Sequence, residues 1–98
     1  MSEIDRTNAL SLVKTRLNRL ATDTTLDTYF LARIDAAVQA IEGTGIILTD
    51  SAADLMLVVD YTVWEYQNRD KPGSMPDWLR LRRRERWLQQ RRADNESG

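Results

Sequence analysis

The stretch Leu26–Gly43, LDTYFLARIDAAVQAIEG, carries the clearest secondary-structure signal in the chain. Its large apolar residues recur at steps of three and four, which places them on one face of a helix and most of its charges off that face. A glycine relieves the steric cost of a left-handed turn, so we expect Gly43 to end this helix. Thr24 and Asp27, three positions apart, resemble a capping arrangement and predict its start. The apolar face comprises Leu26, Phe30, Ile34, Ala37, Val38 and Ile41.

A shorter amphipathic helix is predicted upstream, over residues 8–20, with Thr7 or Asn8 as its cap. The polar run 21–25 separates the two helices. Downstream, residues 46–48 form an apolar connector, which can be extended but is too short to predict a sheet. The apolar face of the upstream helix comprises Leu10, Val13, Leu17 and Leu20.

A third helix is predicted over residues 52–67, because Thr49, Asp50 and Ser51 are all competent N-caps. Its apolar residues lie on two opposite faces. We therefore expect it to be the central helix of the domain or to be covered by a second subunit. Its valines leave a strand as a minority alternative. The aromatic residues expected in the core or in an interface are Tyr61, Trp64 and Tyr66.

The chain changes character after this helix. Residues 68–75 contain a proline and a glycine and predict a turn. Pro76 suits the first turn of a helix, and Asp77 suits its positive N-terminal end. We expect an Arg-rich helix over residues 76–92 and a frayed tail over residues 93–98.

Together these segments predict one all-α domain over residues 1–98. We expect a small bundle of about four helices, with a helical body over residues 8–67 and a protruding Arg-rich C-terminal helix.

The net charge of −1 hides a division along the chain. Residues 1–77 carry seven basic and twelve acidic side chains, whereas residues 78–98 carry seven basic and three acidic ones. Opposite charges steer association, so the basic helix of one copy is expected to lie against the acidic body of the next.

The absence of cysteine and histidine removes most catalytic groups. It excludes a disulfide, a thiolate nucleophile, an imidazole base and a zinc site made of nitrogen and sulfur ligands. Asp54, Asp60 and Glu65 do not share one helical face, so we expect exposed charges rather than catalytic acids or metal ligands. The segment Gly43–Gly45 lacks the lysine of a phosphate loop. We therefore expect no enzyme activity, no cofactor and no metal.

The first residues lack the order of charged and apolar segments that marks a signal peptide, and no apolar run approaches the roughly 20 residues that span a bilayer. We expect a protein that is made in a cytoplasm and does not contact a membrane.

The Arg-rich helix has three interpretations. It can be a solvated helix that Trp78 and Leu81 anchor to the domain. It can bind nucleic acid, with residues 80–92 on phosphates. It can dock onto a protein, with Trp78 and Trp87 as buried anchors and the arginines facing acidic surfaces. Apolar residues on several faces favour protein docking, and the sequence pI of about 5.4 disfavours nucleic acid.

Five segments, taken in chain order, resemble those of a known family. They are Leu12–Leu20, an amphipathic helix starting at Asp27, its end at Ala36–Gly45, Tyr66–Arg69, and Met75–Pro76 opening the Arg-rich helix. The arrangement resembles the head-tail connector proteins of tailed bacteriophages, also called head-completion or DNA-packaging proteins.

The resemblance implies an all-helical virion subunit made in the host bacterial cytoplasm. It implies a ring of about twelve copies at the head-tail interface, which sits on the portal protein, carries a stopper or tail-completion protein and extends the DNA channel. Viral double-stranded DNA passes through without sequence-specific binding. The segment from Met75 onward is then expected to reach the portal or a neighbouring subunit, and residues 43–50 to lie near neighbours or the channel. The docking residues are Met75, Pro76, Trp78, Leu79, Arg80, Arg82, Arg83, Arg84, Arg86, Trp87 and Leu88.

The density of arginine over residues 82–86 departs from the family pattern, and its role stays open. A channel with a strongly basic lining would hold the duplex and slow its transit. We therefore expect the arginines to face protein rather than the channel.

Overall fold

The computed structural model describes the backbone of residues 1–71 and 73–97, and the side chains of the same residues except 4 and 95–97. The chain folds into four helices, and no strand occurs in the described ranges. The prediction of an all-α fold of about four helices is confirmed. The helices are α1 (Glu3–Arg16), α2 (Asp27–Glu42), α3 (Ala52–Gln67) and α4 (Asp77–Ser97).

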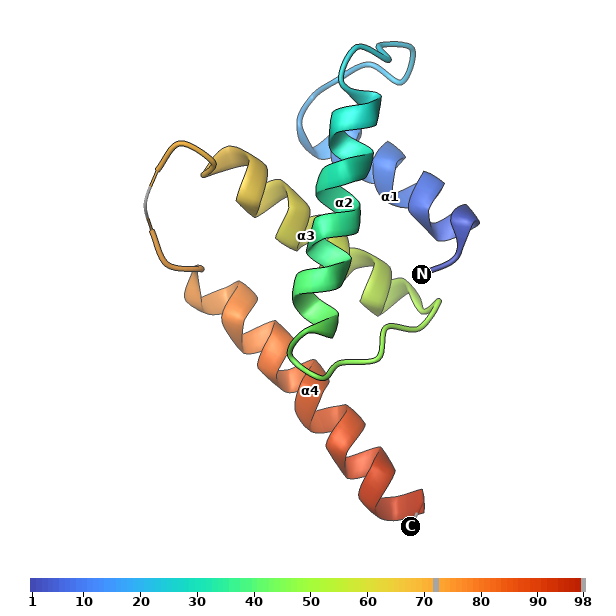
Figure 1. Cartoon of the computed structure of the whole chain (residues 1–98), viewed down its shortest axis with the longest axis vertical. Coiled ribbons are helices and arrows are strands. Elements are labelled where there is room, and N and C mark those ends of the chain that lie inside the picture. Colours follow the sequence, from blue (N-terminus) through green and yellow to red (C-terminus); the bar gives the residue numbers. More distant parts are fainter. Residues whose placement is uncertain (72, 98) are drawn as a thin grey trace.

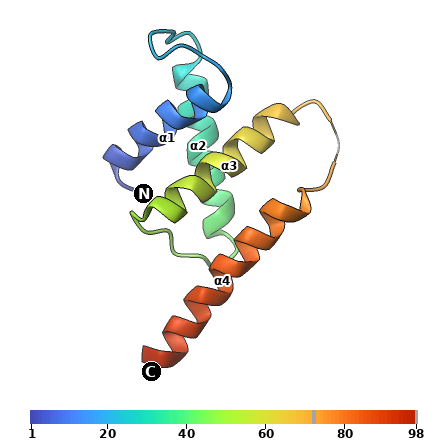
Figure 2. The ribbon, with the colours of Figure 1, turned by 180° about the vertical axis from the view of Figure 1, so that it is seen from behind.

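Helix α3 is central to the bundle: α1 lies on one side of it and α4 on the other, and α2 crosses it with its C-terminal end towards α4 (Figure 1 and Figure 2). It packs against all three of these helices. The consecutive residues Leu57–Val63 are buried, so every side of the helix is covered there. Of the two predicted alternatives, the central helix is confirmed, because its apolar faces are covered within one chain.

The bounds of α3 match the predicted range 52–67. Its cap is Ser51, the last of the three candidates, whose hydroxyl accepts the backbone N–H of Asp54 at 3.1 Å. The aromatic residues Tyr61, Trp64 and Tyr66 belong to the core or pack against it, as predicted.

The predicted start of α1 is wrong. The helix begins before residues 8–20, and its cap is Ser2 rather than Thr7 or Asn8, which lie inside the helix. The Ser2 hydroxyl accepts the backbone N–H of Asp5 at 3.1 Å. Acidic residues in the first turn favour this start, because the N-terminal end of a helix is positive.

Helix α1 also ends earlier than predicted, at Arg16. Asn18 has a φ of 58°, a left-handed conformation that asparagine tolerates and that stops the helix, so Leu20 lies outside it. The predicted cap of α2 at Thr24 is wrong as well. The cap position is Leu26, which makes no side-chain cap hydrogen bond.

Helix α2 ends with Gly43 as its C-cap, as predicted, but the left-handed glycine is Gly45 rather than Gly43. Gly43 keeps a helical φ of −62°, and its N–H donates to the Gln39 carbonyl. Gly45 has a φ of 98° and turns the chain towards Ile46, which is buried. The connector 46–48 forms no strand.

Helix α4 begins at Asp77, and the Pro76 carbonyl accepts the N–H of Leu79 at 3.1 Å. This agrees with a proline at the start of the helix. Part of the turn predicted over residues 68–75 falls on Pro72, which lies outside the described residues.

The predicted tail over residues 93–98 is helical through Ser97. Extending a helix adds one hydrogen bond for each residue fixed, and Ala93 has the highest helix propensity. The last residue of the predicted tail, Gly98, lies outside the described residues.

The core lies between α1, α2 and α3, and α4 contributes one fully buried side chain to it. The buried apolar residues are Ala9, Val13, Phe30, Ile34, Ala37, Ile41, Ile46, Leu57, Val58, Val59, Tyr61, Val63 and Leu79.

Candidate docking surface on α4

Helix α4 has a face towards the body and a face towards solvent, and the predicted docking residues are divided between them. Leu79 is fully buried. Its neighbour Trp78, predicted as an anchor in a partner surface, is 49% exposed. Consecutive helical residues point about 100° apart, so only one of these two neighbours can face α3. Leu79 anchors the helix to the body, so the interpretation in which Trp78 and Leu81 anchor it is wrong, and the docking role of Trp78 stays a prediction.

The remaining docking residues follow the same division. Met75 and Trp87 pack against the core, and the side chains of Arg82 and Arg86 bond to residues of α3. Pro76 and Arg83 are half-buried. The exposed members are Trp78, Arg80, Arg84 and Leu88.

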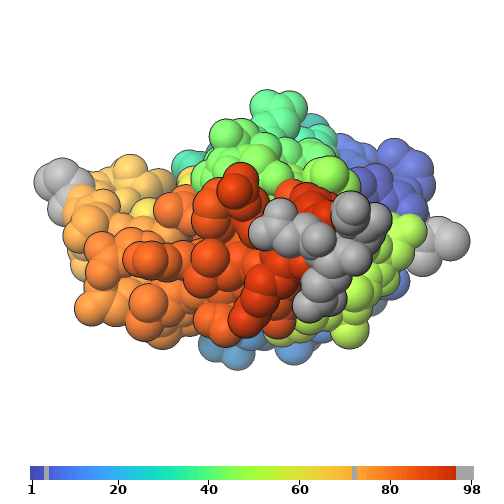
Figure 3. Space-filling model, turned by 90° about the horizontal axis from the view of Figure 1, so that it is seen from below, coloured from blue at the N-terminus to red at the C-terminus, as the bar shows by residue number. Residues whose placement is uncertain are grey.

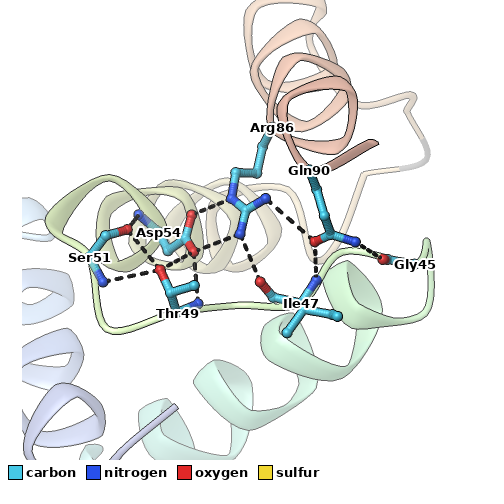
Figure 4. Close-up of polar contacts among 7 residues, drawn as sticks. All are labelled: Gly45, Ile47, Thr49, Ser51, Asp54, Arg86 and Gln90. Carbon is cyan, nitrogen blue, oxygen red and sulfur yellow. Dashed lines mark hydrogen bonds and ion pairs between the residues drawn. The ribbon is translucent and has the colours of Figure 1, made fainter. Parts of the chain in front are cut away.

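Arg86 ties α4 to the start of α3 and to the loop before it (Figure 4). Its Nε donates to Asp54 Oδ1 at 2.7 Å, and its Nη2 donates to Asp54 Oδ2 at 3.2 Å and to the Ile47 carbonyl at 2.7 Å. The Asp54 carboxylate also accepts the N–H and the hydroxyl of Thr49, both at 2.8 Å. A guanidinium and a carboxylate match as planar forks, so this arrangement, the Arg86 clasp, fixes the position of α4.

Gln90, one turn after Arg86, extends this attachment along the same loop. Its Oε1 accepts the N–H of Ile47 at 2.6 Å, and its Nε2 donates to the Gly45 carbonyl at 2.7 Å. Backbone groups of a loop that is not part of a sheet or helix need such partners. The loop before α3 and the middle of α4 therefore form one polar unit.

The prediction that Asp54 is an exposed charge is wrong, because the residue is 2% exposed. Desolvation raises the pKa of this carboxyl. The hydrogen bonds from Arg86 and Thr49 and the charge of Arg86 outweigh it, so the pKa of Asp54 lies below its ordinary value. The carboxylate is ionised at neutral pH and holds the clasp together.

Asp60, predicted as another exposed charge, is 7% exposed. Its two carboxylate oxygens accept separately from Arg16 of α1 and Arg82 of α4. Asp60 thus connects the two helices that flank α3. Glu65, the third predicted exposed charge, is half-buried, and its Oε2 lies 3.7 Å from Nη1 of Arg33.

These contacts change the meaning of the charge division along the chain. Two of the arginines expected to meet another protein, Arg82 and Arg86, pair with acids of their own body. Arg80 pairs with Asp77 at 2.7 Å on the surface, and the Arg91 guanidinium lies 5.1 Å from the centre of the Trp87 ring. The other arginines of α4 form no ion pair with a described residue; they are Arg83, Arg84, Arg91 and Arg92.

A hollow of about 450 Å³ lies beside α4, where the end of α2 approaches it. Figure 3 shows α4 lying across this side of the molecule, bordered by the residues at the end of α2. The Trp87 ring forms part of its wall and lies against Gly45, where an added Cβ would be 3.5 Å from Trp87 Nε1. The hollow is lined by Thr44, Arg80, Leu81, Arg83, Arg84 and Trp87.

The solvent side of α4 carries large apolar side chains. Trp78 is 49% exposed, Leu81 58% and Leu88 38%. Their steps of three and seven place them along one line of the helix, which we call the α4 stripe. Exposed apolar side chains in a row mark an interaction surface more strongly than scattered ones do.

Sequence reasoning missed the acidic partners of α4. Asp54 and Asp60 lie in a helix with apolar residues on two faces, and a carboxylate in such a helix is buried with a cation or not buried at all. That pattern was the available signal. No signal in the sequence pointed to the contacts of Gln90 with the loop, because a glutamine is common on exposed helix faces.

The described part of the chain contains no group of three or more Asp, Glu, His or Cys side chains placed to hold a metal ion. Within residues 1–71 and 73–97, no helix has both the length and the apolar composition that crossing a membrane requires.

Comparison with known proteins gave no relatives: no family model matches the chain, and neither a curated protein nor a solved structure matches it.

Proposed function

We propose that this chain is a structural adaptor of tailed bacteriophages, a head-tail connector subunit whose ring joins the portal vertex of the capsid to the tail or stopper and extends the DNA channel. The observation that carries the proposal is the α4 stripe. It lies on a helix whose opposite face is fixed to the body by Leu79 and the Arg86 clasp. The resemblance of the segments around Gly45 and Met75 to that family supports the same conclusion.

A rigidly held helix with an apolar stripe is suited to bind a groove on another protein. Tryptophan and arginine are enriched among the residues that contribute most to protein interfaces. Arg84 and Arg92, both exposed and without an ion pair among the described residues, flank the stripe and favour an acidic surface on the partner.

The proposal extends to the shape of the subunit, in which the C-terminal part of the Arg-rich helix protrudes as the docking arm. The position of the C-terminal end of α4 at one end of the long axis, opposite the loop between α1 and α2, supports this (Figure 1).

The partners follow from the proposed role. They are about eleven further copies of the chain, the portal protein, and a stopper or tail-completion protein. Double-stranded viral DNA passes through without sequence-specific contacts. The protein has no catalytic task and no cofactor in this role, and it is made in the bacterial cytoplasm before it joins the virion.

The test is binding of the chain to the portal protein encoded in the same genome, measured by co-purification. We expect Trp78→Ala to weaken binding by at least about tenfold, because a central tryptophan contributes 2 kcal/mol or more to an interface. The matched control is Leu20→Ala, which removes an exposed apolar side chain from the loop between α1 and α2. Portal binding that is absent in the wild type, or unchanged in Trp78→Ala, would contradict the proposal.

A second candidate function is nucleic-acid binding by residues 80–92. The observation that favours it is the group of arginines beside Trp87, since guanidinium groups bind phosphates and indoles stack on bases. Arg82 and Arg86 do not contribute, because Asp60 and Asp54 occupy them. This function requires DNA retardation that weakens steeply with salt, and no retardation at low salt would exclude it.

A further inference from the structure

The hollow beside α4 combines positive charge with an aromatic wall. Arg83 and Arg84 line it and make no ion pair with a described residue. Arg80 also lines the hollow. Both side chains of its ion pair with Asp77 are exposed, so water screens the attraction between them. Trp87 supplies a flat apolar surface next to these cations. The hollow is therefore suited to carboxylates that arrive together with apolar or backbone surface.

A complementary group of carboxylates lies elsewhere on the same chain. Glu3 and Asp5 are in the first turn of α1, and Asp50 lies just before α3. Both ribbon views place the N-terminus beside the start of α3. We call these three residues the acidic corner.

Among the described residues, no ion pair within 4.0 Å involves a member of the acidic corner. The pKa of Asp5 is raised above its ordinary value, first by desolvation and then by the hydrogen bond and the negative charge of Asp50. The positive amino terminus acts in the opposite direction. Carboxylates that crowd in this way gain from an external cation. The acids that do have a partner are Asp23, Asp27, Asp35, Asp54, Asp60, Glu65, Asp70 and Asp77.

We propose that the hollow lined by Arg83, Arg84 and Trp87 binds the acidic corner of a second copy of this chain. The inference rests on the proposed function as a ring subunit and assigns the contact between neighbours in the ring. The two patches differ and lie at different places on the subunit, so the contact is heterologous. Such contacts form a closed ring when the rotation between neighbours closes, and an open filament when it does not.

Charge balance favours a second copy over nucleic acid as the occupant. The chain has a net charge of −1 and carries both patches. Each contact between two copies therefore pairs one positive patch with one negative patch. A nucleic acid bound along α4 would leave the acidic corner unpaired and would meet the exposed carboxylates of Asp77 and Glu85 on the same helix.

The test compares the self-association of the full chain and its variants by sedimentation velocity and native mass spectrometry at low salt. Variant one is Arg83→Glu/Arg84→Glu, and variant two is Glu3→Lys/Asp50→Lys. The matched control, Arg69→Glu/Lys71→Glu, makes the same change of net charge as variant one outside both the hollow and α4. Circular dichroism first shows that each variant keeps the wild-type helix content. The neutral pair Glu3→Gln/Asp50→Asn replaces variant two if lysine at position 3 disturbs α1.

The wild type and the control are expected to associate with the same affinity. Each charge-reversed variant alone should associate at least about tenfold more weakly, because like charges then face each other. An equimolar mixture of variants one and two should associate again, since the native hollow of one meets the native corner of the other. A chain carrying all four substitutions should also self-associate.

A monomeric wild type, or association that Arg83→Glu/Arg84→Glu leaves unchanged, would overturn the inference. So would a loss of DNA retardation in that variant with self-association intact, which assigns the hollow to phosphates. Portal binding is measured separately. Absence of portal binding in a chain that associates through the hollow contradicts the proposed function alone. Portal binding by a chain whose self-association survives Arg83→Glu/Arg84→Glu contradicts this inference alone.

Discussion

The Arg86 guanidinium of α4 and the Asp54 carboxylate of α3 face each other through two hydrogen bonds, at 2.7 and 3.2 Å, with the Asp54 side chain 3% exposed. This pair divides the Arg-rich segment into two groups. Arg86 and Arg82 hold the helix on the body, whereas Arg83 and Arg84 border a hollow that is open to partners. Part of the segment therefore holds the fold together, and Arg83 and Arg84 make no ion pair with a described residue.

The first prediction concerns this pair. Arg86→Ala leaves the Asp54 carboxylate buried without its cation, which costs about 3 kcal/mol or more of unfolding free energy. The matched control is Arg84→Ala, which removes an exposed arginine without an ion pair in the described residues and should change stability by less than about 0.5 kcal/mol. Urea denaturation followed by circular dichroism measures both. Equal stability of the two variants would show that the clasp does not form.

The second prediction is the pH dependence of stability. The pKa of Asp54 in the folded chain is lower than its ordinary value of 3.8, so the folded state holds the ionised form more strongly than the unfolded state does. The stabilisation is complete above the unfolded pKa, and it is lost as the pH falls through the folded pKa. We expect the difference in urea midpoint between wild type and Asp54→Asn to shrink from pH 6 towards pH 2.5. A difference that stays constant would contradict the pKa shift.

The third prediction separates the two faces of α4. Leu79 is fully buried, so Leu79→Ala should cost about 2 to 5 kcal/mol of unfolding free energy. Leu81 has the same side chain two positions later and is 58% exposed, so Leu81→Ala should cost less than about 1 kcal/mol. Thermal and urea unfolding of the pair test the orientation of the helix. Reversed costs would mean that α4 packs with its other face.

Most of the fold could be predicted from the sequence. The periodicity of Leu26–Gly43 and the apolar residues of 52–67 identify two helices, because hydrophobic spacing reports directly on the buried face. The ends of helices were harder. Ser2 and Asn18 bound α1 through a cap and a left-handed turn, and both residue types also occur inside predicted segments without such roles.

The candidate surface was less predictable than the fold. Composition located it in the Arg-rich helix. Periodicity within α4 does not say which line of the helix faces α3, so the burial of Leu79 beside the exposed Trp78 could not be predicted. The ion pairs that Asp54 and Asp60 form with arginines join residues 22 to 44 positions apart in the sequence. Such long-range pairs leave no trace in local spacing.

The fourth prediction concerns the turn after α2. Gly45 has a φ of 98°, and Gly45→Ala places a Cβ in a left-handed conformation next to Trp87. We expect a loss of about 1 to 2 kcal/mol, measured by thermal unfolding. Gly73→Ala is the control, because an added Cβ there meets no atom within 4 Å. A loss in Gly73→Ala as large as that in Gly45→Ala would indicate a general cost of alanine in loops.

The last prediction uses the two arginines that share Asp60. Arg16 of α1 and Arg82 of α4 each bond to one carboxylate oxygen, so either arginine alone keeps the buried charge paired. Each single substitution to alanine should therefore cost about 1 kcal/mol, and the double substitution about 3 kcal/mol or more, which exceeds their sum. Urea denaturation of the wild type, the two single variants and the double variant gives the coupling free energy between the two arginines.

The control cycle combines Arg82→Ala with Arg6→Ala, whose partner is Asp35 on α2. These two arginines share no carboxylate, so their costs should add within about 0.5 kcal/mol. If the Arg16 and Arg82 costs also add, the two helices are stabilised independently. A coupling larger than that of the control would show that Asp60 links the stability of α4 to that of α1, because the buried carboxylate depends more on each arginine once the other is removed.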